Sequence, residues 1–191
     1  TAIMDKMPTP GTIVKEEATG KWGMTRLTLS NGMEVYVKPT DYQADVVTMT
    51  VKGEGGTSLY TDADIPNFAL LASAITEGGV GSMTSIQLRK ALTGKSVKVA
   101  PAIGQSSQRI TATSSVKDLE TMLQLTYLYF TAPRRDSVAF EGLRNRTRSF
   151  LTNRSASPKV VYNDSLSAVL YGNNLRTAPA TRQMVDRADY G

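Results

Sequence analysis

The sequence contains no histidine and no cysteine among its 191 residues. Without histidine, Ser–His and Cys–His nucleophilic systems are excluded, and the commonest zinc ligand is absent. Without cysteine, disulfides and thiolate ligands are excluded as well; this is compatible with any compartment and slightly favours an extracytoplasmic one. Carboxylates remain as ligands for calcium or magnesium, but the sequence has no D-x-[DN]-x-[DN]-G loop.

Long apolar runs are also absent, so we expect no membrane span, and no signal peptide opens the chain. Because the first residue is Thr1 rather than methionine, we expect a cut or processed piece. With 40% hydrophobic and 20% charged residues, the composition is typical of a globular protein. The net charge of +5 is a modest surplus that favours acidic partners only weakly, because most such charge is solvated surface.

Residues 1–21 are predicted to be a linker, because they are polar, contain Pro8, Pro10 and Gly11, and show no sustained hydrophobic period. Residues 22–191 are predicted to form a single α+β domain. The absence of repeats and low-complexity tracts supports one domain rather than several.

Alternating apolar residues predict strands in the first part of this domain. Residues 26–38 predict a β-hairpin, in which Asn31-Gly32 supplies the residue pair of a type I′ turn. Residues 46–53 predict a third strand with one apolar face, formed by Val47, Met49 and Val51.

The segment DADIPNFALLASAITEGGVG, residues 62–81, predicts one continuous buried helix. Asp64 is the predicted N-cap, and Gly78 and Gly79 are predicted to end the helix. The apolar face recurs at three- and four-residue steps, and consists of Phe68, Leu70, Leu71, Ala74 and Ile75.

The rest of the chain predicts a short helix, a strand pair and three further helices. A Thr84/Gln87 capping box begins the short helix, and strands follow at residues 97–103 and 109–113. The later helices are predicted to begin near Ser115, Ser137 and Pro158, with one more turn over residues 181–188. Their core-facing residues are predicted to be Leu119, Met122, Leu123, Phe130, Phe140, Leu143, Phe150 and Leu151. The order βββααββααα predicts an antiparallel (mixed) sheet with helices packed on one face.

Two motifs and the helix that follows them resemble the insulinase/pitrilysin family of zinc peptidases. They are LSNGMEVYVKP at residues 29–39, VVTMTVKGEGGTS at residues 46–58, and the helix ending in EGG. Active halves in that family carry H-x-x-E-H on this helix, where two imidazoles bind zinc and the glutamate activates water. The resemblance implies an insulinase-like α+β domain, truncated at its C-terminal end, in a protein built from duplicated domains.

The resemblance places Ala69, Ala72 and Ser73 where His, Glu and His would stand, and the distant ligand near Ser149 or Phe150. None of these side chains is a zinc ligand of that family, so we expect no catalytic residue and no metal site in this chain. Zinc is expected on the catalytic domain of the parent protein instead. Substrate-binding residues stay unassigned.

The chain is similar to the first domain of a C-terminal half, which implies a catalytically inactive domain. It would form part of a substrate-enclosing chamber, while another domain or chain supplies the zinc site for peptide hydrolysis. The implied partners are the N-terminal catalytic half of the same polypeptide or a partner subunit, together with peptide substrates. No nucleic acid partner is expected, and the compartment is expected to be periplasmic or otherwise extracytoplasmic.

The alternative function is a stand-alone, non-enzymatic binding module with a basic face. Its basis is an arginine-rich stretch formed by Arg134, Arg135, Arg144, Arg146, Arg148 and Arg154. Three interpretations of this stretch stay open. It is solvated helix surface, the interpretation we favour; a nucleic-acid surface; or a cleft lining that meets acidic peptide groups.

Overall fold

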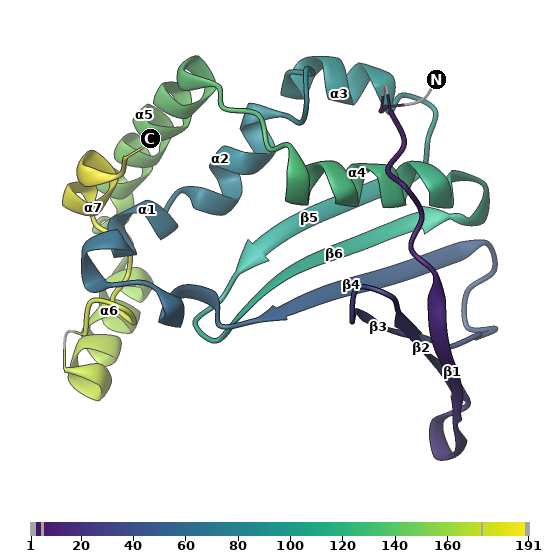
Figure 1. Ribbon diagram of the computed structural model, residues 1–191. Coiled ribbons are helices and arrows are strands. Elements are labelled where there is room, and N and C mark those ends of the chain that lie inside the picture. Colours follow the sequence, from purple (N-terminus) through teal and green to yellow (C-terminus); the bar gives the residue numbers. More distant parts are fainter. Residues whose placement is uncertain (1–2, 5, 173, 190–191) are drawn as a thin grey trace. The chain divides into compact units, whose positions relative to one another are not determined.

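The structure is a computed structural model that describes residues 3–4, 6–172 and 174–189. Its helices and antiparallel strands confirm the predicted α+β class (Figure 1). The strands form two separate three-stranded sheets, however, rather than the single predicted sheet. Contacts divide the chain near Val46 into two compact units, each described here by itself. The single domain over residues 22–191 stays a prediction.

The first unit is an antiparallel sheet of β1 (Ile13–Thr19), β2 (Met24–Leu29) and β3 (Glu34–Val37). The linker prediction is therefore wrong for residues 13–19, which pair with β2 along their whole length. This strand has no apolar period because most of its side chains are exposed. Main-chain bonds and a charged cross-strand row hold it, in which Arg26 pairs with Glu17 and Glu34. The pKa values of both carboxyls are lowered, for Glu34 mainly by its hydrogen bond from Arg26.

The predicted hairpin forms between β2 and β3, but its turn differs from the predicted type I′. Only Gly32 has a positive φ, of 83°, whereas Asn31 does not. The Gly32 N–H donates to the carbonyl of Leu29, and the Met33 N–H donates to Asn31 Oδ1 at 3.0 Å. These bonds define a three-residue loop with glycine at its left-handed position, because the asparagine side chain folds back on the main chain.

The second unit contains a sheet with the strand order β4-β6-β5, built from β4 (Val46–Glu54), β5 (Val97–Ile103) and β6 (Ser107–Ser115). Its longer helices are α4 (Leu119–Thr131), α5 (Ser137–Arg154) and α6 (Pro158–Tyr171). Its shorter helices are α1 (Ile65–Phe68), α2 (Leu71–Gly78), α3 (Ser85–Ala91) and α7 (Arg182–Arg187). The predicted alternation in β4 and the Thr84/Gln87 capping box of α3 are both confirmed.

Helix α4 lies across the sheet and contacts β5 and β6 (Figure 1). Met122 and Leu125 are almost fully buried beneath it, as are Ile110 and Ala112 of β6. The prediction that Leu123 and Phe130 face the sheet is wrong, since these side chains are 47% and 55% exposed. Phe150 of α5 is 66% exposed and likewise lies outside the core.

The predicted continuous helix over residues 62–81 is interrupted after Phe68. The N–H groups of Ala69 and Leu70 donate to carbonyls only three residues back, at 3.3 and 3.2 Å, and α2 begins at Leu71. Leu70 is 3% exposed and packs in a cluster with four residues from α5, α7 and the residue after α7, namely Phe140, Leu143, Val185 and Ala188. Tertiary packing of this side chain thus overrides the regular helical pattern.

The two ends of this helical segment follow the prediction only in part. Asp64 is not the predicted cap of α1, because its carboxylate accepts hydrogen bonds from the Thr61 N–H and hydroxyl in a capping box one turn earlier. Gly78 and Gly79 do end α2 as predicted, and Gly79 has a φ of 91°. A Cβ at Gly79 would lie 2.2 Å from the Met83 carbonyl oxygen, so only glycine fits there.

Replacing Leu70 with alanine is expected to lower the free energy of unfolding by ~2–5 kcal/mol, because it leaves a cavity in the buried cluster. Leu71→Ala is the matched control, since Leu71 is only half-buried and lines a surface groove, and we expect it to cost less than half as much. Urea midpoints of both variants measure the difference. Equal costs would show that the interruption does not select Leu70 for the core.

A buried carboxylate joins β5, β6 and the start of α4. Asp118 Oδ2 accepts hydrogen bonds from the Ser115 hydroxyl at 2.7 Å and from the Ser96 N–H at 2.9 Å. These bonds, the serine hydroxyl first, lower the pKa of Asp118 below its ordinary value of 3.8. The ionised form is therefore the one that the fold stabilises.

Because the folded-state pKa of Asp118 is lowered, its contribution to stability is present above the unfolded pKa and is lost as the pH falls through the folded value. Asp118→Asn is expected to destabilise the chain at pH 7 and to narrow its stability difference from the wild type as the pH falls below about 4. Urea midpoints across this range provide the measurement. A difference that does not change with pH would contradict this role.

Candidate functional site

An apolar groove lies between α2, the ends of β5 and β6, and α4. Its cavity, of about 190 Å³, receives Leu71, Ala72 and Ile75 from α2. The remaining lining comes from Pro101, Ala102, Ile103, Gln108, Arg109, Ile110, Tyr129 and Phe130. The exposure of Phe130 is thus explained, because its ring lines this groove instead of the interior. Burial raises the pKa of the Tyr129 phenol, so its hydroxyl stays neutral.

The groove follows an edge strand. In the order β4-β6-β5 only one side of β5 has a strand neighbour, and among the described residues no strand pairs with its other side. Pro101 lies within β5 opposite Ile110 of β6; proline lacks an N–H and within sheets is confined mainly to edge strands. A second cavity, of about 570 Å³, adjoins the first half of β5 at Val97–Val99 and shares Tyr129 with the first cavity.

The structure separates the three positions at which the resemblance placed the zinc motif. Ala69 is exposed and follows α1, whereas Ala72 and Ser73 belong to α2. Of the three, only Ala72 lines the groove. The interruption before Leu71 means that the first and last positions do not lie on one regular helix. Ser149 and Phe150, the predicted position of the distant ligand, are exposed on α5.

These residues do not fit a zinc ion. Two methyl groups and one hydroxyl offer no imidazole, thiolate or carboxylate, which are the groups that bind zinc in proteins. Elsewhere in the described part of the chain, no three His, Cys, Asp or Glu side chains gather where they would hold a metal. The chemistry that this groove offers is therefore apolar contact and main-chain hydrogen bonding.

The groove continues past Leu71 and Ile75 into a neighbouring cavity of about 330 Å³. The second cavity is lined by the segment between α4 and α5 and by residues of α1, α2 and α5, including Asn67, Ala74, Pro133, Arg134, Arg135, Phe140 and Asp189. Apolar side chains thus give way to guanidinium groups at this end.

Most of the arginine-rich stretch forms ion pairs that join neighbouring helices. Arg146 pairs with Glu77 of α2, and Arg148 with Asp186 of α7. Arg154 binds Asp164 of α6 through two hydrogen bonds, of 3.1 and 2.6 Å. The Arg144 guanidinium lies over the Phe140 ring, pairs with Glu141 and donates to the Ala188 carbonyl. These pairs oppose the nucleic-acid interpretation, because their positive charge is already matched within the fold.

Arg176 fixes the loop before α1, a role that the sequence did not suggest. Its Nη1 donates to the Thr57 carbonyl at 3.0 Å, and its Nη2 donates to the Tyr60 carbonyl at 2.8 Å and pairs with Asp62. The partners lie more than a hundred residues away in sequence, so no local pattern signals the contact. Pro101, in contrast, was a usable signal for an edge strand.

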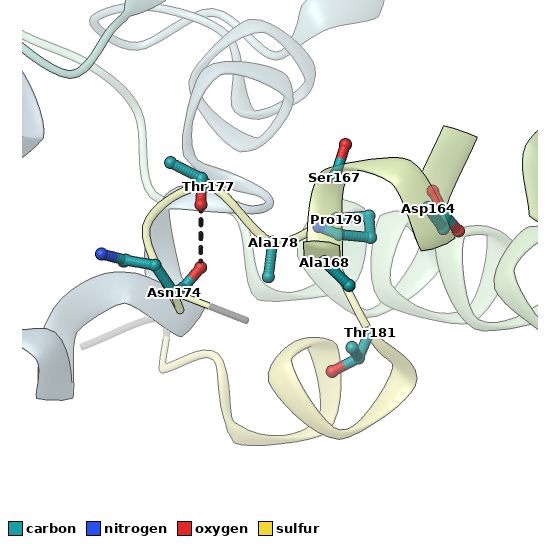
Figure 2. Close-up of a pocket in the computed structure, with 8 residues that line it drawn as sticks. All are labelled: Asp164, Ser167, Ala168, Asn174, Thr177, Ala178, Pro179 and Thr181. Carbon is teal, nitrogen blue, oxygen red and sulfur yellow. Dashed lines mark hydrogen bonds between the residues drawn. The ribbon is translucent and has the colours of Figure 1, made fainter. Parts of the chain in front are cut away.

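A separate cavity of about 270 Å³ lies between α6 and residues 174–181 (Figure 2). Its polar groups already have local partners: the Thr177 hydroxyl donates to the Asn174 carbonyl, and the Thr181 hydroxyl accepts from the Met184 N–H to cap α7. Asp164 is bound by Arg154. We therefore assign these residues to local structure rather than to ligand binding.

The fold is that of an insulinase-like metallopeptidase domain. It is similar to the crystal structure of the periplasmic protease PqqL from Escherichia coli, with a TM-score of 0.79 and 17% identity over 98% of this chain and 20% of that one. It is also similar to a peptidase M16 inactive domain from Pseudomonas fluorescens, with a TM-score of 0.65 and 16% identity over 85% of this chain and 42% of that one.

In sequence, the chain is 27% identical over 176 residues to a protein of Arabidopsis thaliana named zinc protease PQQL-like. The match covers 90% of this chain but only 16% of that protein. No model of a known protein family matches the chain. Together the sequence and fold similarities confirm the predicted resemblance to insulinase-like peptidases. Within the described residues, no helix is both long and apolar enough to cross a bilayer.

Proposed function

We propose that the chain is a catalytically inactive domain of a larger zinc-dependent peptidase and forms part of the chamber that encloses the peptide. The observation that carries this proposal is the apolar groove beside an edge strand, with Ala72 in its lining and no zinc-binding residue at Ala69, Ala72 or Ser73. Support comes from relatives that are named as zinc proteases and as an inactive domain. The zinc would lie on another domain or subunit of the parent.

The groove suits an extended peptide. The outer side of β5 offers main-chain N–H and C=O groups to an added strand, and the cavities beside it accept apolar side chains. Such binding needs no particular substrate sequence for its main-chain part. An inactive domain built in this way would hold a peptide without cutting it.

An exposed apolar face on α6, which we call the α6 face, supports a further partner. It consists of Val161, Tyr162, Leu166, Val169, Leu170 and Tyr171, and none of these is buried. Clustered apolar exposure of this kind marks an interaction site. The proposed occupant is the N-terminal catalytic half of the same polypeptide or a partner subunit, since the chain spans only 16% of its Arabidopsis relative.

We propose a periplasmic or otherwise extracytoplasmic compartment, which the name of the Escherichia coli protease supports. The alternative function, a stand-alone module with a basic face, is weakened by the arginine ion pairs across α5. The parent open reading frame separates the two: an H-x-x-E-H motif in a neighbouring domain supports the peptidase, and its absence supports the module.

The purified chain is expected to contain no stoichiometric zinc and to cut no peptide, yet to bind an extended peptide in the groove. Metal analysis, a hydrolysis assay and fluorescence anisotropy with a labelled, C-terminally amidated peptide of alternating valine and threonine measure the three properties. Ala72→Trp should fill the cavity and weaken binding by at least about tenfold.

Ser73→Trp is the matched control, because it places the same ring on the exposed neighbouring position; it should leave the affinity unchanged. One zinc per chain, or peptide cleavage, would overturn the assignment. Equal binding by both tryptophan variants would show that the peptide lies elsewhere.

The α6 face is expected to make the isolated chain self-associate or bind a hydrophobic dye. Tyr162→Glu combined with Val169→Glu should reduce both effects, because charge disfavours burial of this face. Val138→Glu on α5, where the wild-type side chain is 82% exposed, is the control and should change neither. Sedimentation velocity and dye fluorescence provide the readouts. A double variant that behaves like the wild type would argue against an interface at α6.

A further inference from the structure

The segment that connects α4 to α5 is held tightly against the end of α2. The Arg134 N–H donates to the Gly79 carbonyl at 3.0 Å, and Pro133 forms an isolated bridge with Val80, which is fully buried. A Cβ at Gly78 would lie 2.3 Å from the Arg134 carbonyl oxygen, so glycine permits this approach. The main chain of Arg134 is therefore fixed, and Arg135 follows directly from it.

These two arginines differ from the four that follow them in the sequence. Arg134 has only a long ion pair, 3.6 Å from Asp136, and its Nε is buried without a hydrogen bond. The other carboxylate oxygen of Asp136 accepts from the Ala139 N–H and caps α5. Arg135 is exposed, and within the described residues it has neither a hydrogen bond nor an ion pair. Positive charge is thus available here.

Both arginines line the 330 Å³ cavity that continues the groove. The cavity sets two guanidinium groups against one carboxylate, that of Asp189, whose main-chain N–H donates to Asn67 Oδ1 at 2.8 Å. Its remaining lining is mainly apolar and includes Leu71, Ala74, Ile75, Pro133 and Phe140. A group that combines a carboxylate with a short apolar stem matches such a site, because guanidinium binds carboxylates through paired N–H groups.

We propose that this end of the groove is a subsite for an acidic side chain of the bound peptide, contacted by Arg134 and Arg135. Since Leu71 and Ile75 line both cavities, an apolar residue in the β5 cavity places a nearby glutamate or aspartate within this cavity. The subsite rests on the proposed peptide-holding function and adds a preference to it. Peptides with an acidic residue beside apolar ones are then the favoured class.

The test compares two labelled, C-terminally amidated peptides that differ only by glutamate or glutamine beside the valine–threonine stretch. Amidation removes the terminal carboxylate as a competing source of charge. The wild-type chain is expected to bind the glutamate peptide about fivefold to tenfold more tightly, and added salt should reduce this ratio. Arg135→Gln should bring the ratio close to one; the residue is exposed, so the fold should be retained.

Arg187→Gln is the matched control, because Arg187 is exposed on α7 and lines neither cavity; its ratio should equal that of the wild type. Equal binding of the two peptides by the wild type would overturn the subsite and leave the peptide-holding function standing. Failure of both peptides to bind would overturn both proposals. Equal loss of the ratio in Arg187→Gln and Arg135→Gln would also overturn the subsite, since general charge would then explain the preference.

Discussion

Burial of Leu70 is the constraint on which the second unit depends. Its side chain packs against Phe140, Leu143 and Val185, and this packing interrupts the helix between Phe68 and Leu71. A zinc motif of the H-x-x-E-H type needs its two histidines one turn apart on one regular helix. The interruption falls within that turn. The same side chain therefore stabilises the core and removes the helical geometry that a metal site would need.

Charge is distributed around this core in two different ways. The arginines of α5 meet carboxylates on α2, α6 and α7, so their charge joins helices. Exposed pairs of this kind contribute only ~0–1 kcal/mol each, and their larger effect is to neutralise the surface. Arg134 and Arg135 precede α5 and lack such close partners. A basic stretch that looks uniform in the sequence thus divides into a structural part and an available part.

Local rules predicted the elements that local interactions define. The capping box at Thr84, the glycine stop at Gly79 and the alternation of β4 need only neighbouring residues. The strand β1 was missed because its side chains are mostly exposed and its pairing is with main chain, which leaves no apolar period. Phe150 was placed in the core because its helical position is consistent with the apolar stripe of α5. Its 66% exposure depends on where the helix packs, which no local pattern encodes.

The site shows the same division between local and distant causes. Ala69, Ala72 and Ser73 were identified from a motif, and the structure adds that only Ala72 lines the groove. Pro101 could have identified β5 as an edge strand, because the missing N–H is costly anywhere else in a sheet. Arg135 could not have been singled out, since its availability depends on the carboxylates that its neighbours occupy. Binding residues of this kind are defined by what the fold leaves unpaired, and that is known only after every ion pair has been placed.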